Sequence, residues 1–126
     1  MSKEAFPKER TVQRDIVRGL RTLGLAVVAI PNGGAYEGDE QKRIRMAMSK
    51  RMEGVVSGFP DLLIMSKRGP SRFGLLEVKR EGASLSTDHA KRQLDCHAAI
   101  AADGHAVALV RSVDEAVTAV KSWGLI

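Results

Sequence analysis

Residues Gly58 to Glu81 read GFPDLLIMSKRGPSRFGLLEVKRE, and they place two acids and a lysine inside runs of hydrophobic residues. The charged residues in question are Asp61, Glu77 and Lys79. An unpaired charge is costly to bury. These three residues therefore need partners or a function.

Two strands are predicted in this stretch, over residues 61–66 and 73–79, with a Gly-Pro turn between them that indicates a hairpin. Alternate residues of a strand point to the same face, so Glu77 and Lys79 are expected to project together. The hairpin returns Asp61, at the start of the first strand, toward the end of the second. We therefore expect two carboxylates and an ammonium group to converge on one face of the sheet.

Four helices and two further strands are predicted from hydrophobic spacing and stop signals elsewhere in the chain. The helices cover residues 9–23, 39–53, 87–103 and 112–123, and the strands cover residues 25–30 and 105–110. The order α-β-α-β-β-α-β-α predicts an α/β sandwich, with helices flanking a small mixed central sheet. At 126 residues the chain has the length of one domain, and we expect residues 1–126 to form it.

Two of the helices have apolar positions at helical spacing, which predict an apolar side. In helix 39–53 this side consists of Ile44, Met48 and Met52. In helix 87–103 the apolar positions are mostly alanines, which allow close packing on a sheet: Ala90, Leu94, Ala98 and Ala101. The sequence SVDE, from Ser112 to Glu115, fits a capping box that opens the last helix.

The net charge indicates a polyanionic partner. Twenty Lys and Arg residues against 15 Asp and Glu give a formal charge of +5, which favours nucleic acid. Aromatic residues make up only 4% of the chain, so contact with DNA is expected to rest on phosphates rather than on stacked bases. Candidate phosphate contacts are Arg14 and Arg18 of the first helix and Lys42 and Arg43 of the second, although such basic stripes are more often solvated faces.

Several other classes of protein do not fit the sequence. No apolar run is long enough to cross a bilayer, and the first residues lack the apolar region of a secretory signal, so we expect a cytoplasmic protein without membrane contact. The single cysteine, Cys96, excludes an internal disulfide and a CxxC pair. The histidines His89, His97 and His105 lack the spacing of a zinc site, and we interpret them as ordinary structural residues.

Converging carboxylates repel each other unless a cation lies between them. Hard oxygen ligands select Mg²⁺ or Mn²⁺ rather than zinc. A lysine beside such an ion can orient or deprotonate a water that attacks phosphorus, which is the chemistry of phosphodiester hydrolysis. A plainer alternative stays open, in which Glu77 and Lys79 form an exposed strand pair and Asp61 is a turn residue.

The order of PD, a hairpin and then EVK resembles the PD-(D/E)XK nuclease superfamily, which has the restriction-endonuclease-like fold. More narrowly, the chain resembles the short stand-alone VRR-NUC nucleases that phages often encode. The resemblance extends from about Glu9 to Glu115, through ERTVQ, PNGG, GVVSGFPDLLI, LLEVKREGASLS and DGHAVALVRSVDEA. It implies that Asp61 and Glu77 bind Mg²⁺ or Mn²⁺, that the carbonyl of Val78 completes the metal's shell, and that Lys79 assists the attacking water.

The resemblance also implies three residues outside the hairpin. Glu9 is the acid that the first helix contributes to the metal site, and Asn32 of PNGG lines the DNA groove. The family usually places a catalytic glutamine one helical turn after a Leu-Ser pair. Here that position holds His89, and Gln93 follows one turn later on the same side of the helix, so Gln93 is the candidate.

The resulting hypothesis is a metal-dependent DNA endonuclease. The family resembles Holliday junction resolvases, which implies selectivity for branched or junction DNA, a homodimer, and action in a bacterial host cell if a phage encodes the protein. One alternative is a catalytically inactive DNA-binding module with a nuclease fold, and the intact set of Asp61, Glu77 and Lys79 argues against it. Another is a restriction-type endonuclease, for which the chain is too short to add a recognition domain.

Overall fold

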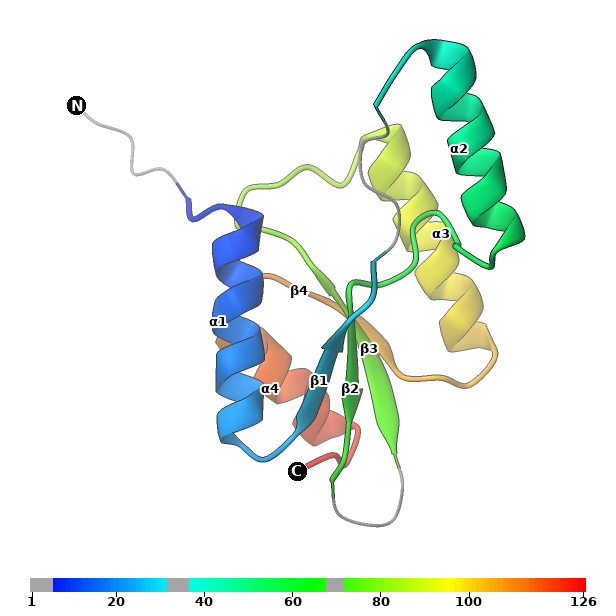
Figure 1. Ribbon diagram of the computed structural model, residues 1–126. Coiled ribbons are helices and arrows are strands. Elements are labelled where there is room, and N and C mark those ends of the chain that lie inside the picture. The colour runs from blue at the N-terminus through cyan, green and yellow to red at the C-terminus, as the bar shows by residue number, and fades with distance from the viewer. Residues whose placement is uncertain (1–5, 32–36, 68–71) are drawn as a thin grey trace, which may run out of the picture.

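The computed structural model describes residues 6–31, 37–67 and 72–126, and the elements follow the predicted order (Figure 1). The helices are α1 (Glu9–Thr22), α2 (Glu40–Met52), α3 (Asp88–Ala102) and α4 (Val113–Ser122). The strands are β1 (Ala26–Ala29), β2 (Leu62–Met65), β3 (Phe73–Val78) and β4 (Val107–Val110). In the described part of the chain, none of the helices is long and apolar enough to span a membrane.

The strands form one mixed sheet in the order β1-β2-β3-β4. β1 pairs with β2, and β2 with β3, in antiparallel fashion, whereas β3 and β4 are parallel. Figure 1 shows α1 and α4 on one side of this sheet and α3 on the other. This arrangement confirms the predicted sandwich and is consistent with a restriction-endonuclease-like fold. The tip of the β2–β3 hairpin, at residues 68–71, lies outside the described residues.

The main core lies between the sheet and the helix pair α1 and α4. α1 buries residues four apart, which is the spacing of one helix face: Val12, Ile16 and Leu20. α4 contributes Ala116 and Val120, and the strands contribute alternate residues, among them Leu62, Ile64, Leu76 and Val78. Each fully buried side chain of this size stabilises the fold by about 1.5–3 kcal/mol. The residues between them, including Asp61 and Glu77, therefore face the side of α3.

α3 turns a different side to the sheet from the one that its sequence predicts. Ala90 is buried as expected, but three positions expected to pack on the sheet are exposed: Leu94, Ala98 and Ala101. The buried side consists instead of Ala90, Gln93 and His97. The physical reason lies beneath the helix, where the sheet presents the charged Glu77. Polar side chains from α3 can satisfy that charge, whereas Leu94 in the same place would leave it without a partner.

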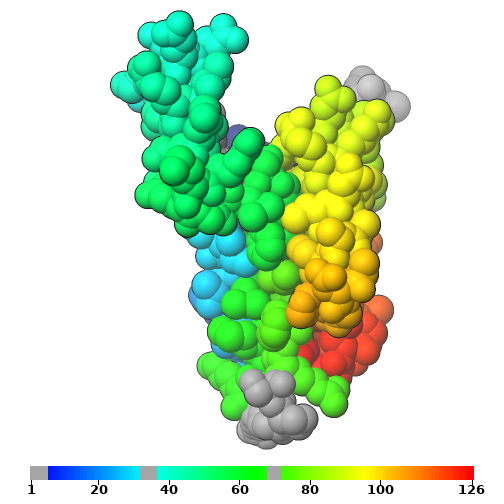
Figure 2. Space-filling view, turned by 90° about the vertical axis from the view of Figure 1, so that its right-hand side faces the viewer, coloured from blue at the N-terminus to red at the C-terminus, as the bar shows by residue number. Residues whose placement is uncertain are grey.

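α2 projects from the rest of the molecule (Figures 1 and 2). The helix buries none of its residues, and its predicted apolar side is open, with Ile44 51%, Met48 57% and Met52 89% exposed. Its first turn is capped by the side chain of Asp39, which accepts a hydrogen bond from the backbone N–H of Lys42 at 2.8 Å. Nothing in the described parts of the chain covers its apolar side.

Candidate active site

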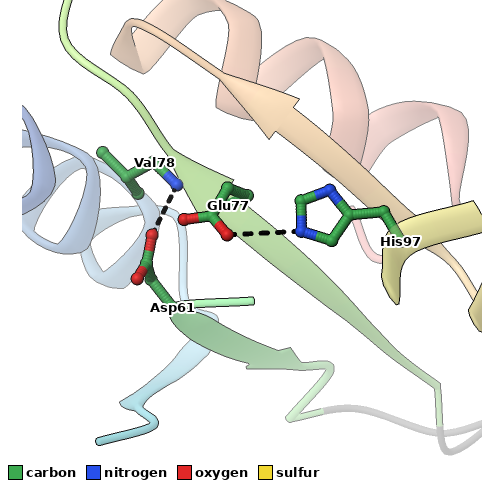
Figure 3. A network of polar contacts seen from close by, with 4 residues as sticks. All are labelled: Asp61, Glu77, Val78 and His97. Carbon is green, nitrogen blue, oxygen red and sulfur yellow. Dashed lines mark hydrogen bonds and ion pairs between the residues drawn. The ribbon is translucent and has the colours of Figure 1, made fainter. Parts of the chain in front are cut away.

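Asp61 and Glu77 meet on neighbouring strands. β2 and β3 pair Leu62 with Leu76, and continuing that register by one residue places Asp61 opposite Glu77. The carboxylate of Asp61 accepts a hydrogen bond from the backbone N–H of Val78 at 2.8 Å (Figure 3), and its carbonyl accepts one from the N–H of Ile30 at 2.8 Å. Asp61 is therefore held from both neighbouring strands, which confirms the expected convergence of the two acids.

Glu77 and Lys79 are both buried, at 1% and 8% exposure. They lie two residues apart in one extended segment and so project to the same face. The N–H of Lys79 donates to the carbonyl of Val110 at 3.0 Å, which continues the pairing with β4 past the end of β3. The alternative of an exposed strand pair is wrong, because neither side chain reaches the surface as such a pair would.

The pKa values of the two acids reflect their burial and proximity. The pKa of Asp61 is raised to about 7 by desolvation, then by proton sharing with the Glu77 carboxyl and by repulsion from its charge, while Val78 and Lys79 act in the opposite direction. Desolvation also raises the pKa of Glu77, against the stabilising effects of Asp61 and Lys79. Near neutral pH the pair therefore retains a proton unless a cation replaces it.

His97, which the sequence predicts only as an ordinary structural residue, belongs to the same cluster. Its Nε2 lies 3.2 Å from Oε1 of Glu77, and both side chains are buried (Figure 3). Desolvation lowers the pKa of His97, so the ring is neutral at physiological pH. A signal was present in the sequence, since the four-residue spacing of Gln93 and His97 places two polar side chains on one side of α3.

Gln93 lies on the buried side of α3, and its catalytic role stays a prediction. It is 6% exposed, and its Oε1 is buried without a hydrogen-bond partner in the described structure, as is Oε2 of Glu77. An unpaired buried acceptor costs about 1–3 kcal/mol, and a cation or an ordered water would satisfy both atoms. Two carboxylates with spare oxygen acceptors fit a hard cation such as Mg²⁺ or Mn²⁺.

Glu9 lies at the edge of the cluster, at the exposed start of α1. Its pKa is raised mainly by desolvation, and the charges of Lys79 and Asp61 are among those that act on it. Within the described ranges, no three His, Cys, Asp and Glu side chains are grouped so that they alone would hold a metal ion. A direct metal bond from Glu9 therefore stays a prediction.

The predicted phosphate contacts have different surroundings. Arg14 and Arg18 line an open groove along α1 that begins beside Glu9. Lys42 and Arg43 are exposed on α2, and Asn32 lies outside the described residues. In the same groove Arg21 donates to the carbonyl of Val27 on the edge strand at 3.0 Å, so its guanidinium also binds the fold's own backbone.

The sequence matched no protein-family model and no curated protein. Among solved structures, a protein titled VRR_NUC domain is 26% identical, with 92% of this chain and 97% of that chain aligned at a TM-score of 0.58. This chain is therefore similar to a VRR_NUC domain over almost its whole length. A second structure, titled VRR_NUC domain protein, shares the fold at 21% identity and a TM-score of 0.63, over 93% of this chain and 88% of its own. The likeness supports a nuclease-type fold for the chain.

Proposed function

We propose that the protein is an endonuclease that hydrolyses phosphodiester bonds of DNA and depends on Mg²⁺ or Mn²⁺. The proposal is supported above all by the buried cluster of Asp61, Glu77 and Lys79 within a nuclease-type fold. Two adjacent acids and a buried lysine are unfavourable in a protein that only binds DNA, because the acids repel phosphates. The same three groups are useful for hydrolysis at phosphorus.

The roles follow from the position of each group. The carboxylates of Asp61 and Glu77 and the carbonyl of Val78 would hold the metal, and Glu9 is a further candidate ligand. When bound, the ion lowers the pKa of a water and stabilises charge on the phosphate. Lys79, on the same face as Glu77, would orient or activate the attacking water. Gln93 contributes its amide beside Glu77, where it fixes the position of that water or of the phosphate.

The DNA backbone is proposed to follow the groove of α1. Arg14 and Arg18 line it together with Glu9, whose carboxyl interacts with the charges of Lys79 and Asp61. A strand held along the arginines would therefore run toward the cleavage site. Lys42 and Arg43 on the projecting α2, together with Asn32, extend this contact. Phosphate contacts of this kind position DNA without reading its sequence.

The substrate is proposed to be branched or junction DNA, cut by a homodimer. The resemblance described above supports both statements, and the open apolar side of α2 supports the second. α2 has acidic Glu40 in its first turn and basic Lys50 and Arg51 in its last. An antiparallel pair of α2 helices, one from each copy, would cover both apolar sides and place opposite charges next to each other. Two active sites would then address two strands.

The proposal is tested by incubating the protein with linear, flap and four-way-junction DNA, with Mg²⁺ or Mn²⁺ or with chelator. We expect cleavage that needs the metal and is fastest on branched DNA. Asp61→Asn and Glu77→Gln should abolish cleavage while DNA binding is retained or strengthened, because each removes a negative charge near phosphate. Tight binding of every substrate without cleavage would instead identify an inactive DNA-binding module.

A further inference from the structure

The contact between His97 and Glu77 has no role in the mechanism above. His97 lies on α3, on the opposite side of the site from α1, and it contacts the acid that is least exposed to solvent. The contact joins only one of the two carboxylate oxygens. Oε1 faces the histidine ring, whereas Oε2, while Asp61 is ionised, has no hydrogen-bond donor among the described residues (Figure 3).

We propose that His97 is a positioning residue, which donates its Nε2–H to Oε1 of Glu77 and so keeps Oε2 directed toward Asp61 as the oxygen that binds the divalent cation. This inference rests on the proposed function. With Glu77 ionised, only the ring can donate, so the direction of the hydrogen bond is fixed. The other ring nitrogen, Nδ1, is then left as an acceptor.

The need for such a residue follows from the side chain of glutamate. The last torsion of Glu, which rotates the carboxylate, has a broad energy profile, so the strand fixes the position of the group but not its orientation. Asp61 differs, because the N–H of Val78 already holds one of its oxygens. Glu77 has no such backbone donor among the hydrogen bonds of the described structure, and His97 provides the equivalent contact from α3.

The position of α3 is itself set close to the loop that leads to Asp61. Gly58, two residues before Pro60, is buried against the backbone of α3, where an added Cβ would lie 3.0 Å from the carbonyl oxygen of Arg92 and 3.1 Å from Cα of Gln93. The helix that carries His97 and the loop that leads to Asp61 are therefore in direct contact.

A residue that orients a metal ligand, as His97 is proposed to orient Glu77, typically contributes 10–100-fold in metal affinity or activity.

The test compares Mn²⁺ affinity, measured by electron paramagnetic resonance, in wild type and in variants of His97. His97→Leu keeps bulk but has no donor, and we expect its Mn²⁺ affinity to fall about 10–100-fold, with a lower melting temperature in chelator because Glu77 loses its partner. His97→Gln can place an amide N–H close to the position of Nε2 and should restore most of the affinity. His97→Asn is too short to reach Glu77 and should not. His105→Leu, at an exposed histidine, serves as the control.

The Mn²⁺ affinities of these variants support or overturn the role of His97. Full Mn²⁺ affinity in a folded His97→Leu protein would overturn the role of His97 and leave the proposed function intact. Equal losses of Mn²⁺ affinity in His97→Gln and His97→Asn would assign the effect to packing and would also overturn the inference. The comparison of these two variants tests the inference even if His97→Leu does not fold. A wild-type protein that binds no Mn²⁺ and cuts no DNA would refute the proposed function and the inference together.

Discussion

Ionisation of Asp61 should lower the stability of the metal-free protein. Its pKa in the folded chain is raised to about 7 from an ordinary value of 3.8, so the folded state binds the proton more tightly than the unfolded state does. The resulting stabilisation is fully present below pH 3.8 and is lost as the pH rises through 7. Asn at this position can still accept from the N–H of Val78 but cannot ionise.

In chelator, Asp61→Asn is therefore expected to raise the melting temperature at pH 8.5 and to change it much less at pH 5. The measurement is the difference in melting temperature between variant and wild type at the two pH values, which cancels the titration of other groups to first order. Added Mn²⁺ should stabilise wild type at pH 8.5 and have little effect on the variant. A difference that is the same at both pH values would contradict the assigned pKa shift.

Substitution of Lys79 should affect the cleavage rate but not the binding of metal or DNA. If its amine orients or activates the water, Lys79→Ala should retain Mn²⁺ and DNA binding while single-turnover cleavage falls on the order of 10²–10⁴-fold. Lys79→Arg should also be poorly active, because guanidinium keeps its proton and its planar shape does not replace a compact ammonium. Near wild-type cleavage together with a lower melting temperature in the alanine variant would show that Lys79 only pairs with Glu77.

At the scale of elements, the hairpin was predictable and the orientation of α3 was not. The β2–β3 pair has turn residues and alternating side chains, and both signals are local. The apolar spacing of α3 predicts that Leu94 and the alanines are buried, whereas the structure buries Ala90, Gln93 and His97. That preference arises from Glu77, a partner 20 residues away from His97, and spacing within the helix carries no information about such a partner.

The packing of α3 on the loop before Asp61 gives a prediction for Gly58. Gly58→Ala combines a positive φ of 82° with a Cβ 3.0 Å from the carbonyl oxygen of Arg92. Gly104→Ala, at the end of the same helix, has a similar φ of 85° but meets no atom within 4 Å. In the Gly104→Ala control, the free energy of unfolding should therefore fall only by the backbone strain, about 1–2 kcal/mol. In Gly58→Ala it should fall by about 1–3 kcal/mol more, because the added Cβ also crowds α3.

Urea unfolding of both variants measures this difference, and Mn²⁺ affinity measures its effect on the site. We expect weaker Mn²⁺ binding only in Gly58→Ala, because only there is α3 pushed away from Glu77. Equal stability in the two variants would mean that the loop and the helix separate at no cost.

At the scale of the whole molecule, the element order and the mixed sheet followed from the sequence, but the place of α2 did not. The sequence shows both the charged and the apolar residues of α2. No pattern within the helix, however, indicates whether its apolar side packs against the rest of the same chain. The structure leaves that side open. α1 was easier to place, because its buried residues Val12, Ile16 and Leu20 face the inward residues of the strands.

The open side of α2 makes the homodimer testable. At 100° per residue, Glu40 and Arg51 lie on the same flank of the apolar side, and a two-fold axis between antiparallel helices brings like flanks together. Glu40 of one copy would then face Arg51 of the other. One helix pair buries less than the roughly 1,200 Å² of a standard interface, so the dimer should be weak and dependent on concentration.

Sedimentation equilibrium over a range of concentrations should show dimers for wild type and monomers for Met48→Glu. Met46 lies almost opposite Met48 around the helix, at 36% exposure, so Met46→Glu introduces the same charge on the other side and should still dimerise. Neither substitution should change the melting temperature of the monomer much, because α2 buries no side chain. Monomeric Met48→Glu that cuts one strand of a junction as fast as wild type, but no longer both in one encounter, would link the dimer to paired cleavage. Dimers that persist in Met48→Glu would place the interface elsewhere on the molecule.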